Sequence, residues 1–105
     1  MDIKKRKRLE AAGWRVGSTQ AFLELSDAEA ELVDMRVSLG AKLRTRRERA
    51  RLTQTAVARR LKSSQSRVAK MEAADSSVSI DLLVKSLLAM GASRKEVANS
   101  IAPAR

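Results

Sequence analysis

Residues 52–72, LTQTAVARRLKSSQSRVAKME, contain two short stretches with helical spacing, joined by a tight connection. Aliphatic side chains at Val57, Leu61 and Val68 can fill the inner faces of two steeply crossing helices. Ala58 is small enough to let the two backbones approach each other. The segment therefore predicts two short helices that cross at a sharp turn.

The outward face of the second predicted helix carries hydrogen-bonding groups and no acidic group. Its members are Gln65, Ser66, Arg67 and Lys70. A helix fits the major groove of B-DNA, where a glutamine can bond adenine in a bidentate manner and an arginine or lysine can bond guanine O6 and N7. Gln65 and Arg67 are therefore expected to contact base edges.

Basic charge is concentrated around this segment. The chain has 22 Lys+Arg and 12 Asp+Glu, a formal net charge of +10, and residues 42–73 alone hold eleven basic and two acidic side chains. Such an imbalance is expected of a surface that meets a polyanion. On charge alone, a nucleic-acid partner and a merely solvated basic face are equally open.

Several function classes are excluded by what the sequence lacks. There is no cysteine and no histidine among the 105 residues, so disulfides, cysteine-ligated zinc and thiol catalysis are excluded. Without a phosphate-cradling glycine-rich loop or paired catalytic carboxylates, we expect no enzymatic activity, no cofactor and no metal site. No apolar run suits a membrane span and the basic start has no signal-peptide core, so we expect no membrane association and a cytoplasmic, nucleoid-associated protein.

The rest of the chain predicts further helices and no strands, because strand-like alternation is nearly absent and the one proline stands at position 103. Ser26 with Glu29 and Ser93 with Glu96 fit the capping box. Other N-caps are expected at Thr53, Ser64 and Ser79. Helices are expected over about 27–50, 54–61, 65–73, 80–90 and 94–102, with further helical turns over 4–12 and 19–24.

The first long helix has one apolar stripe, which suits either the protein core or a dimer seam. The stripe consists of Leu32, Met35, Leu39 and Leu43. Gly40, inside this helix, costs about 1 kcal/mol relative to alanine, so it marks either a break or a close approach of another helix. The helix over 80–90 is apolar on more than one face and is expected at the centre of the core.

Over about residues 40–102 the sequence resembles the Cro and phage-repressor (XRE) helix-turn-helix family. The matching features are Leu52-Thr53-Gln54, the small Ala58, Ser63-Ser64-Gln65-Ser66, and Met71-Glu72. The resemblance implies an all-α, five-helix, lambda-repressor-like domain over 27–105, with the helix-turn-helix at 53–73, a long first helix and a small basic extension over 1–26. The expected partner is double-stranded DNA. We expect a homodimer, because one short recognition helix makes few contacts and a two-fold dimer reads two half-sites.

The resemblance implies that Gln54 contacts the DNA backbone and supports the recognition helix, and that the matching positions of that helix meet phosphates or base edges. With phosphate contacts added from the basic block, the expected DNA-binding residues are Gln54, Ser64, Gln65, Ser66, Arg67, Lys70, Arg44, Arg47 and Lys62. The family often has glycine where this chain has Arg51, Lys62 and Ala74. Either the turns differ here, or each residue accepts a positive φ at a cost of about 1 kcal/mol.

These features predict a sequence-specific transcriptional regulator, a repressor of its own operon. An alternative is an antitoxin similar to the HigA type, whose main role is to neutralise a small toxin protein. The acidic side chains Asp27, Glu29, Glu31 and Asp34 would suit a basic partner. Sequence-independent nucleic-acid binding is a third hypothesis, which the shortage of stacking aromatic residues disfavours.

The N-terminal extension has two notable features. The basic run over residues 4–8 suits a phosphate- or minor-groove-binding arm, or a solubilising tail. An apolar cluster would either dock on the long helix or bind a partner protein. It comprises Trp14, Val16, Phe22, Leu23 and Leu25.

Overall fold

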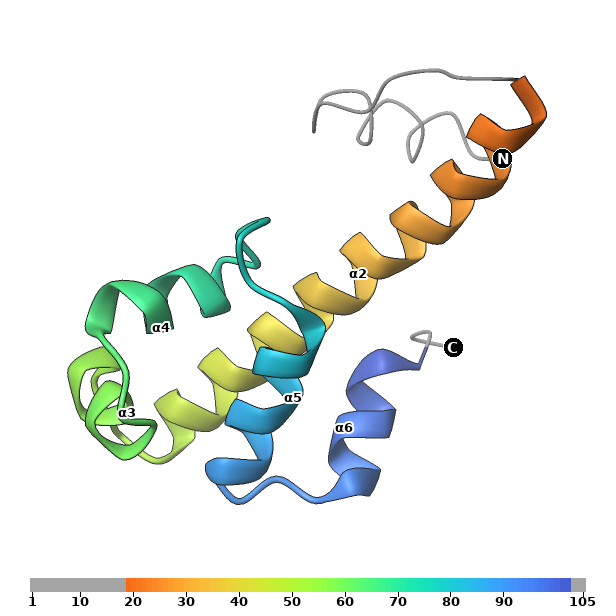
Figure 1. Cartoon of the computed structure of the whole chain (residues 1–105). Helices are drawn as coiled ribbons and strands as arrows, with labels where there is room; N and C mark the ends of the chain where they lie inside the picture. The colour runs from red at the N-terminus through yellow and green to blue at the C-terminus, as the bar shows by residue number, and fades with distance from the viewer. Residues whose placement is uncertain (1–18, 103–105) are drawn as a thin grey trace. The chain divides into compact units, whose positions relative to one another are not determined.

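The computed structural model describes the backbone of residues 19–102 and the side chains from Ser26 to Ala102 (Figure 1). All elements in this range are α-helices, as predicted. They are α2 (Thr19–Arg49), α3 (Gln54–Arg60), α4 (Gln65–Glu72), α5 (Ile80–Ala89) and α6 (Arg94–Ile101). The chain forms two compact units, Met1–Asp34 and Met35–Arg105, whose boundary falls within α2. The helix expected over 4–12 and the side chains of the N-terminal apolar cluster lie outside the described residues.

Helix α2 begins earlier than predicted. It starts at Thr19, whereas the Ser26–Glu29 capping box predicts a start at residue 27. That prediction is wrong, because Ser26 lies inside the helix and is fully buried. No glycine or proline separates Thr19 from Ser26, so nothing in this stretch ends a helix before the apparent cap. The helical turn expected over 19–24 is thus the start of α2 itself.

The core of the second unit lies between α2 and the four shorter helices. Leu39 and Leu43 of α2 and Leu83 and Leu87 of α5 are fully buried, and the predicted central place of α5 is confirmed. The apolar stripe of α2 is divided, since Leu32, in the first unit, is 37% exposed. The C-terminal part of the stripe therefore belongs to the core.

The predicted caps of the four shorter helices all form. In each, a serine or threonine oxygen accepts a hydrogen bond of 3.0–3.2 Å from the backbone N–H three residues on. The capping residues are Thr53, Ser64, Ser79 and Ser93. These side chains satisfy backbone donors that a helix start otherwise leaves without a partner. They fix where α3 to α6 begin.

Helices α2 to α5 end in the same doubly hydrogen-bonded turn, the Schellman motif. At the end of α2, the N–H of Leu52 bonds the carbonyl of Arg47 and the N–H of Arg51 bonds that of Glu48. Each of the four turns has one residue in the left-handed conformation, and only the turn after α5 uses glycine there. The four residues are Arg51 (φ 56°), Lys62 (φ 54°), Ala74 (φ 55°) and Gly91 (φ 93°). The turns thus keep the backbone that favours glycine, and three side chains accept the strain.

Gly40 marks a close approach of α4 to α2, and α2 continues through it without a break. A Cβ atom at this position would lie 2.5 Å from the carbonyl oxygen of Met71 and 3.2 Å from that of Glu72. Backbone oxygens at that distance cannot yield as a flexible side chain can. The absence of a side chain at Gly40 therefore lets the end of α4 lie against α2.

We predict that Gly40→Ala destabilises the protein by about 1–3 kcal/mol, because the new methyl group overpacks the crossing. Helix propensity alone would give the opposite sign. Ser38→Ala, an exposed change on the same helix, is the matched control and should leave stability unchanged or slightly higher. Urea denaturation measures both, and a Gly40→Ala protein as stable as the wild type would contradict the assigned crossing.

We predict that Ala74→Gly stabilises the protein by about 0.5–1 kcal/mol, since relief of the left-handed strain exceeds the entropy cost of glycine. Ala73, the preceding residue, has an ordinary right-handed backbone (φ −83°). Ala73→Gly should therefore lose about 0.5–1 kcal/mol. Thermal unfolding of the two variants provides the comparison, and equal losses would show that Ala74 carries no strain.

Candidate nucleic-acid interface

An ion pair between α2 and α4 lies behind the predicted recognition helix. Arg47 Nε donates to Glu72 Oε2 at 2.6 Å, and Arg47 Nη2 donates to Glu72 Oε1 at 3.0 Å. The third guanidinium nitrogen, Nη1, donates to the carbonyl of Leu52 at 3.0 Å. This bidentate geometry is the strong form of an arginine–carboxylate contact. It joins the end of α4 to α2 and to the connection between α2 and α3.

The pair is well shielded from solvent, since the side chains of Arg47 and Glu72 are only 14% and 5% exposed. The hydrogen bond with Glu72 raises the pKa of Arg47 above its usual value. The guanidinium thus stays charged while the protein is folded. If either partner were removed, the other charge would remain buried without compensation, which is costly.

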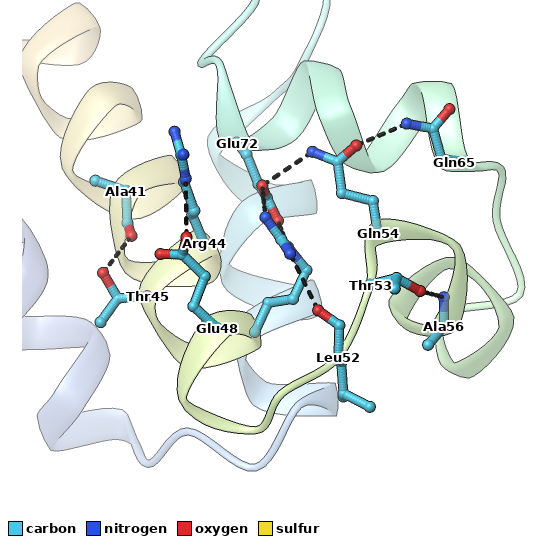
Figure 2. Close-up of polar contacts among 11 residues, drawn as sticks. Ala41, Arg44, Thr45, Glu48, Leu52, Thr53, Gln54, Ala56, Gln65 and Glu72 are labelled. Carbon is cyan, nitrogen blue, oxygen red and sulfur yellow. Dashed lines mark hydrogen bonds and ion pairs between the residues drawn. The ribbon is translucent and has the colours of Figure 1, made fainter.

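The hydrogen bonds of the pair extend outward through Gln54 to Gln65, the first residue of α4 (Figure 2). Gln54 Nε2 donates to Glu72 Oε1 at 3.1 Å, and Gln65 Nε2 donates to Gln54 Oε1 at 2.6 Å. Gln54 therefore uses both ends of its amide and fixes the side chain of Gln65. The Gln65 side chain is exposed and still has an amide oxygen and a second N–H proton to offer a ligand.

The other predicted residues of the recognition helix lie together along an open cleft of about 280 Å³. Ser64 caps α4 and lies 3.3 Å, hydroxyl to hydroxyl, from Ser66. Arg67 and Lys70 follow on the same exposed side. The cleft is lined by Ser64, Ser66, Arg67, Lys70, Ser77, Val78 and Leu82. The structure thus brings hydroxyl and cationic groups together next to Gln65.

The three basic residues predicted outside α4 have different surroundings. Arg44 is exposed, with Nε 3.6 Å from Glu48 Oε2. Lys62 is exposed in the α3–α4 turn. Arg47 binds Glu72 and Leu52 with three of its nitrogens, so its guanidinium is directed into the domain. Among the side chains described from Ser26 to Ala102, no group of acidic residues is placed to hold a metal ion.

Residues 38–99 match the sequence model of the helix-turn-helix domain family. The chain belongs to this family. The match lies within the second unit and includes the crossing helices α3 and α4, which agrees with the resemblance to Cro and phage repressors. No curated protein and no solved structure matches the chain.

The helix-turn-helix domain is a DNA-binding module, which suggests a DNA-binding regulator. Domains of this family are typically not enzymes. No helix among residues 19–102 is long and apolar enough to cross a membrane.

Glu72 is the site residue that the sequence reasoning missed. In the sequence it stands out only as part of the family-like pair Met71-Glu72, although it is one of two acidic residues in the basic block over 42–73. Its isolation among cations was a usable signal, since a buried carboxylate needs a cationic partner. The sequence alone does not show which of the neighbouring arginines supplies that partner, because the choice depends on how α2 and α4 cross.

We predict that Glu72→Ala lowers the free energy of unfolding by about 2–4 kcal/mol, because the guanidinium of Arg47 is left shielded and unpaired. Glu48→Ala removes a carboxylate from the exposed pair with Arg44 and should change stability by at most about 0.5 kcal/mol. Urea denaturation of the two variants tests the contrast. Similar losses would mean that the Arg47–Glu72 pair contributes no more than a surface contact.

Proposed function

We propose that the protein is a sequence-specific transcriptional repressor that reads double-stranded DNA with α4 in the major groove. The observation that carries this proposal is the fixed glutamine pair. Gln65 is held by Gln54, which is held by Glu72, so a polar, exposed amide is oriented before any ligand arrives. A fixed amide of this kind suits bidentate recognition of adenine.

We assign base contact to Gln65 and Arg67. Ser64, Ser66 and Lys70 would meet phosphates or base edges from the adjoining cleft. The N-terminal turn of α4 contains no acidic residue and also favours a phosphate, because its backbone N–H groups and helix dipole attract an anion.

The basic residues outside α4 take two roles in this proposal. Lys62 and Arg44 would contact phosphates, since the exposed pair of Arg44 with Glu48 is weak enough for DNA to displace. Arg47 acts as a positioning residue through Glu72. Gln54 supports Gln65 and faces the DNA backbone.

We further propose that the repressor acts as a homodimer on its own operon and is associated with the nucleoid. One helix of eight residues makes few base contacts. Two copies related by a two-fold axis would read half-sites about 34 Å apart, one turn of the duplex. A toxin-binding role stays a prediction from the acidic segment of the sequence, because no contact described for residues 26–102 adds to it.

The test is fluorescence anisotropy with the duplex upstream of the protein's own gene and a shuffled duplex of equal length, each at two salt concentrations. We expect the upstream duplex to bind about 10³-fold more tightly or better, and both affinities to fall with salt through counterion release. Equal affinities that fall together would overturn sequence-specific repression of its own operon.

We predict that Arg67→Ala weakens binding to the upstream duplex by about 1–3 kcal/mol and relaxes the preference over the shuffled duplex. Lys95→Ala removes the same charge from an exposed position on α6 and serves as the control. It should affect both duplexes slightly and equally. An equal loss on both duplexes for Arg67→Ala would assign Arg67 to phosphate rather than to bases.

A further inference from the structure

A second cleft lies between the α3–α4 turn and α5, with a volume of about 310 Å³. Four of its lining side chains are cations and none is acidic. The cations are Arg60, Lys62, Arg67 and Lys85. Apolar groups from α4, α5 and the turn also line the cleft, namely Leu61, Met71, Leu82 and Ala89. The cleft therefore combines strong positive charge with apolar walls.

These four cations have no acidic partner in the part of the chain that the structure describes. By contrast, Arg44, Arg46 and Arg47 each form a salt bridge with a glutamate. Like charges gathered around an apolar-walled hollow repel one another, and such a hollow focuses the field that they create. An anion in the cleft would relieve this repulsion.

Ser63, which lines the cleft, supplies a second observation. Its hydroxyl oxygen is buried and has no hydrogen-bond partner. Buried hydroxyls normally have a partner, so this one calls for an explanation. Ser86 opposite is also buried, and its hydroxyl donates only to the sulfur of Met71, at 3.4 Å. The lining thus contains one hydroxyl whose hydrogen-bonding capacity is unused, and this hydroxyl can donate to an acceptor-rich ligand once its side chain turns toward the cleft.

We propose that this cleft binds a small organic anion, with its phosphate or carboxylate held by the cations and Ser63 and a short apolar body on Leu61 and Leu82. The volume is at the lower end of small-molecule sites, which hold about 300–1,000 Å³. A small organic anion fits this cleft better than a duplex backbone, because the backbone phosphates of a duplex carry no apolar body that would cover Leu61 and Leu82.

The occupant would also weaken DNA binding, because Arg67 lines this cleft as well as the one along α4. This coupling rests on the proposed function, in which Arg67 reads bases. By thermodynamic reciprocity, DNA would weaken the binding of the anion by the same factor.

The site is tested without DNA, by titrating ¹⁵N-labelled protein with phenyl phosphate and following the backbone amide shifts of residues 60–67 and 82–89. We expect saturable shifts, and an affinity lowered about tenfold by Lys85→Gln. Lys95→Gln removes the same charge on α6 and should have no effect. Shifts that do not saturate, or equal binding by the two variants, would overturn the site.

Two further measurements refine the test. Ser63→Ala should keep the stability of the wild type, since it removes an unpaired hydroxyl, yet bind phenyl phosphate more weakly; unchanged binding would overturn the role of Ser63. Inorganic phosphate at matched ionic strength should bind more weakly than phenyl phosphate. Equal affinity for the two would overturn an organic ligand and leave a site for bare phosphate.

The coupling is measured by anisotropy with the upstream duplex at saturating phenyl phosphate. We expect DNA affinity to fall severalfold in the wild type and to fall less in Lys85→Gln. Undiminished affinity would overturn the coupling. Absence of specific DNA binding altogether would overturn the proposed function, and the titration without DNA would still report on the anion site.

Discussion

The ion pair between Arg47 and Glu72 fixes the end of α4 against α2, and the polar side chains at the start of the recognition helix are positioned through that contact. The close approach of the two helices is also permitted sterically, because Gly40 leaves room for the carbonyl oxygens of Met71 and Glu72 where a side chain would collide with them. The charge of Arg47 attracts Glu72, and Gly40 leaves room for the backbone of α4. Electrostatic attraction and steric fit thus both favour the same crossing of the two helices.

The same carboxylate connects stability to the surface that we assign to DNA. Glu72 accepts hydrogen bonds from Arg47 inside the domain and from Gln54 at its edge, and Gln54 accepts one from Gln65. Glu72 is one of only two acidic residues in the basic block over 42–73. It holds the recognition helix in place and does not lie on the exposed surface, where it would repel a phosphate. Preorganisation of this kind reduces the ordering cost of binding.

The short helices could be predicted to within about a residue at each end, because their limits are set by local chemistry. Thr53, Ser64, Ser79 and Ser93 cap their starts, and the turns after them close locally. The start of α2 could not be predicted in this way. Ser26 and Glu29 have the spacing of a capping box, but the helix already begins at Thr19, so Ser26 lies inside it and cannot cap it. The partner of Glu72 also escaped prediction, and for Gly40 the sequence left open both a helix break and the close approach that the structure has. The partner of Glu72 and the role of Gly40 both depend on how two helices far apart in sequence meet.

In the structure, the Arg47–Glu72 pair positions the side-chain amide of Gln65 through Gln54. Side-chain ¹⁵N relaxation in the DNA-free protein measures how rigid that amide is. Asn99, exposed on α6, provides a reference amide in the same sample. We expect the Gln65 amide to be clearly more rigid than that of Asn99 in the wild type, and to become as mobile as Asn99 in Gln54→Ala. A Gln65 amide that is already as mobile as Asn99 in the wild type, or that stays rigid in Gln54→Ala, would contradict the positioning role of the network.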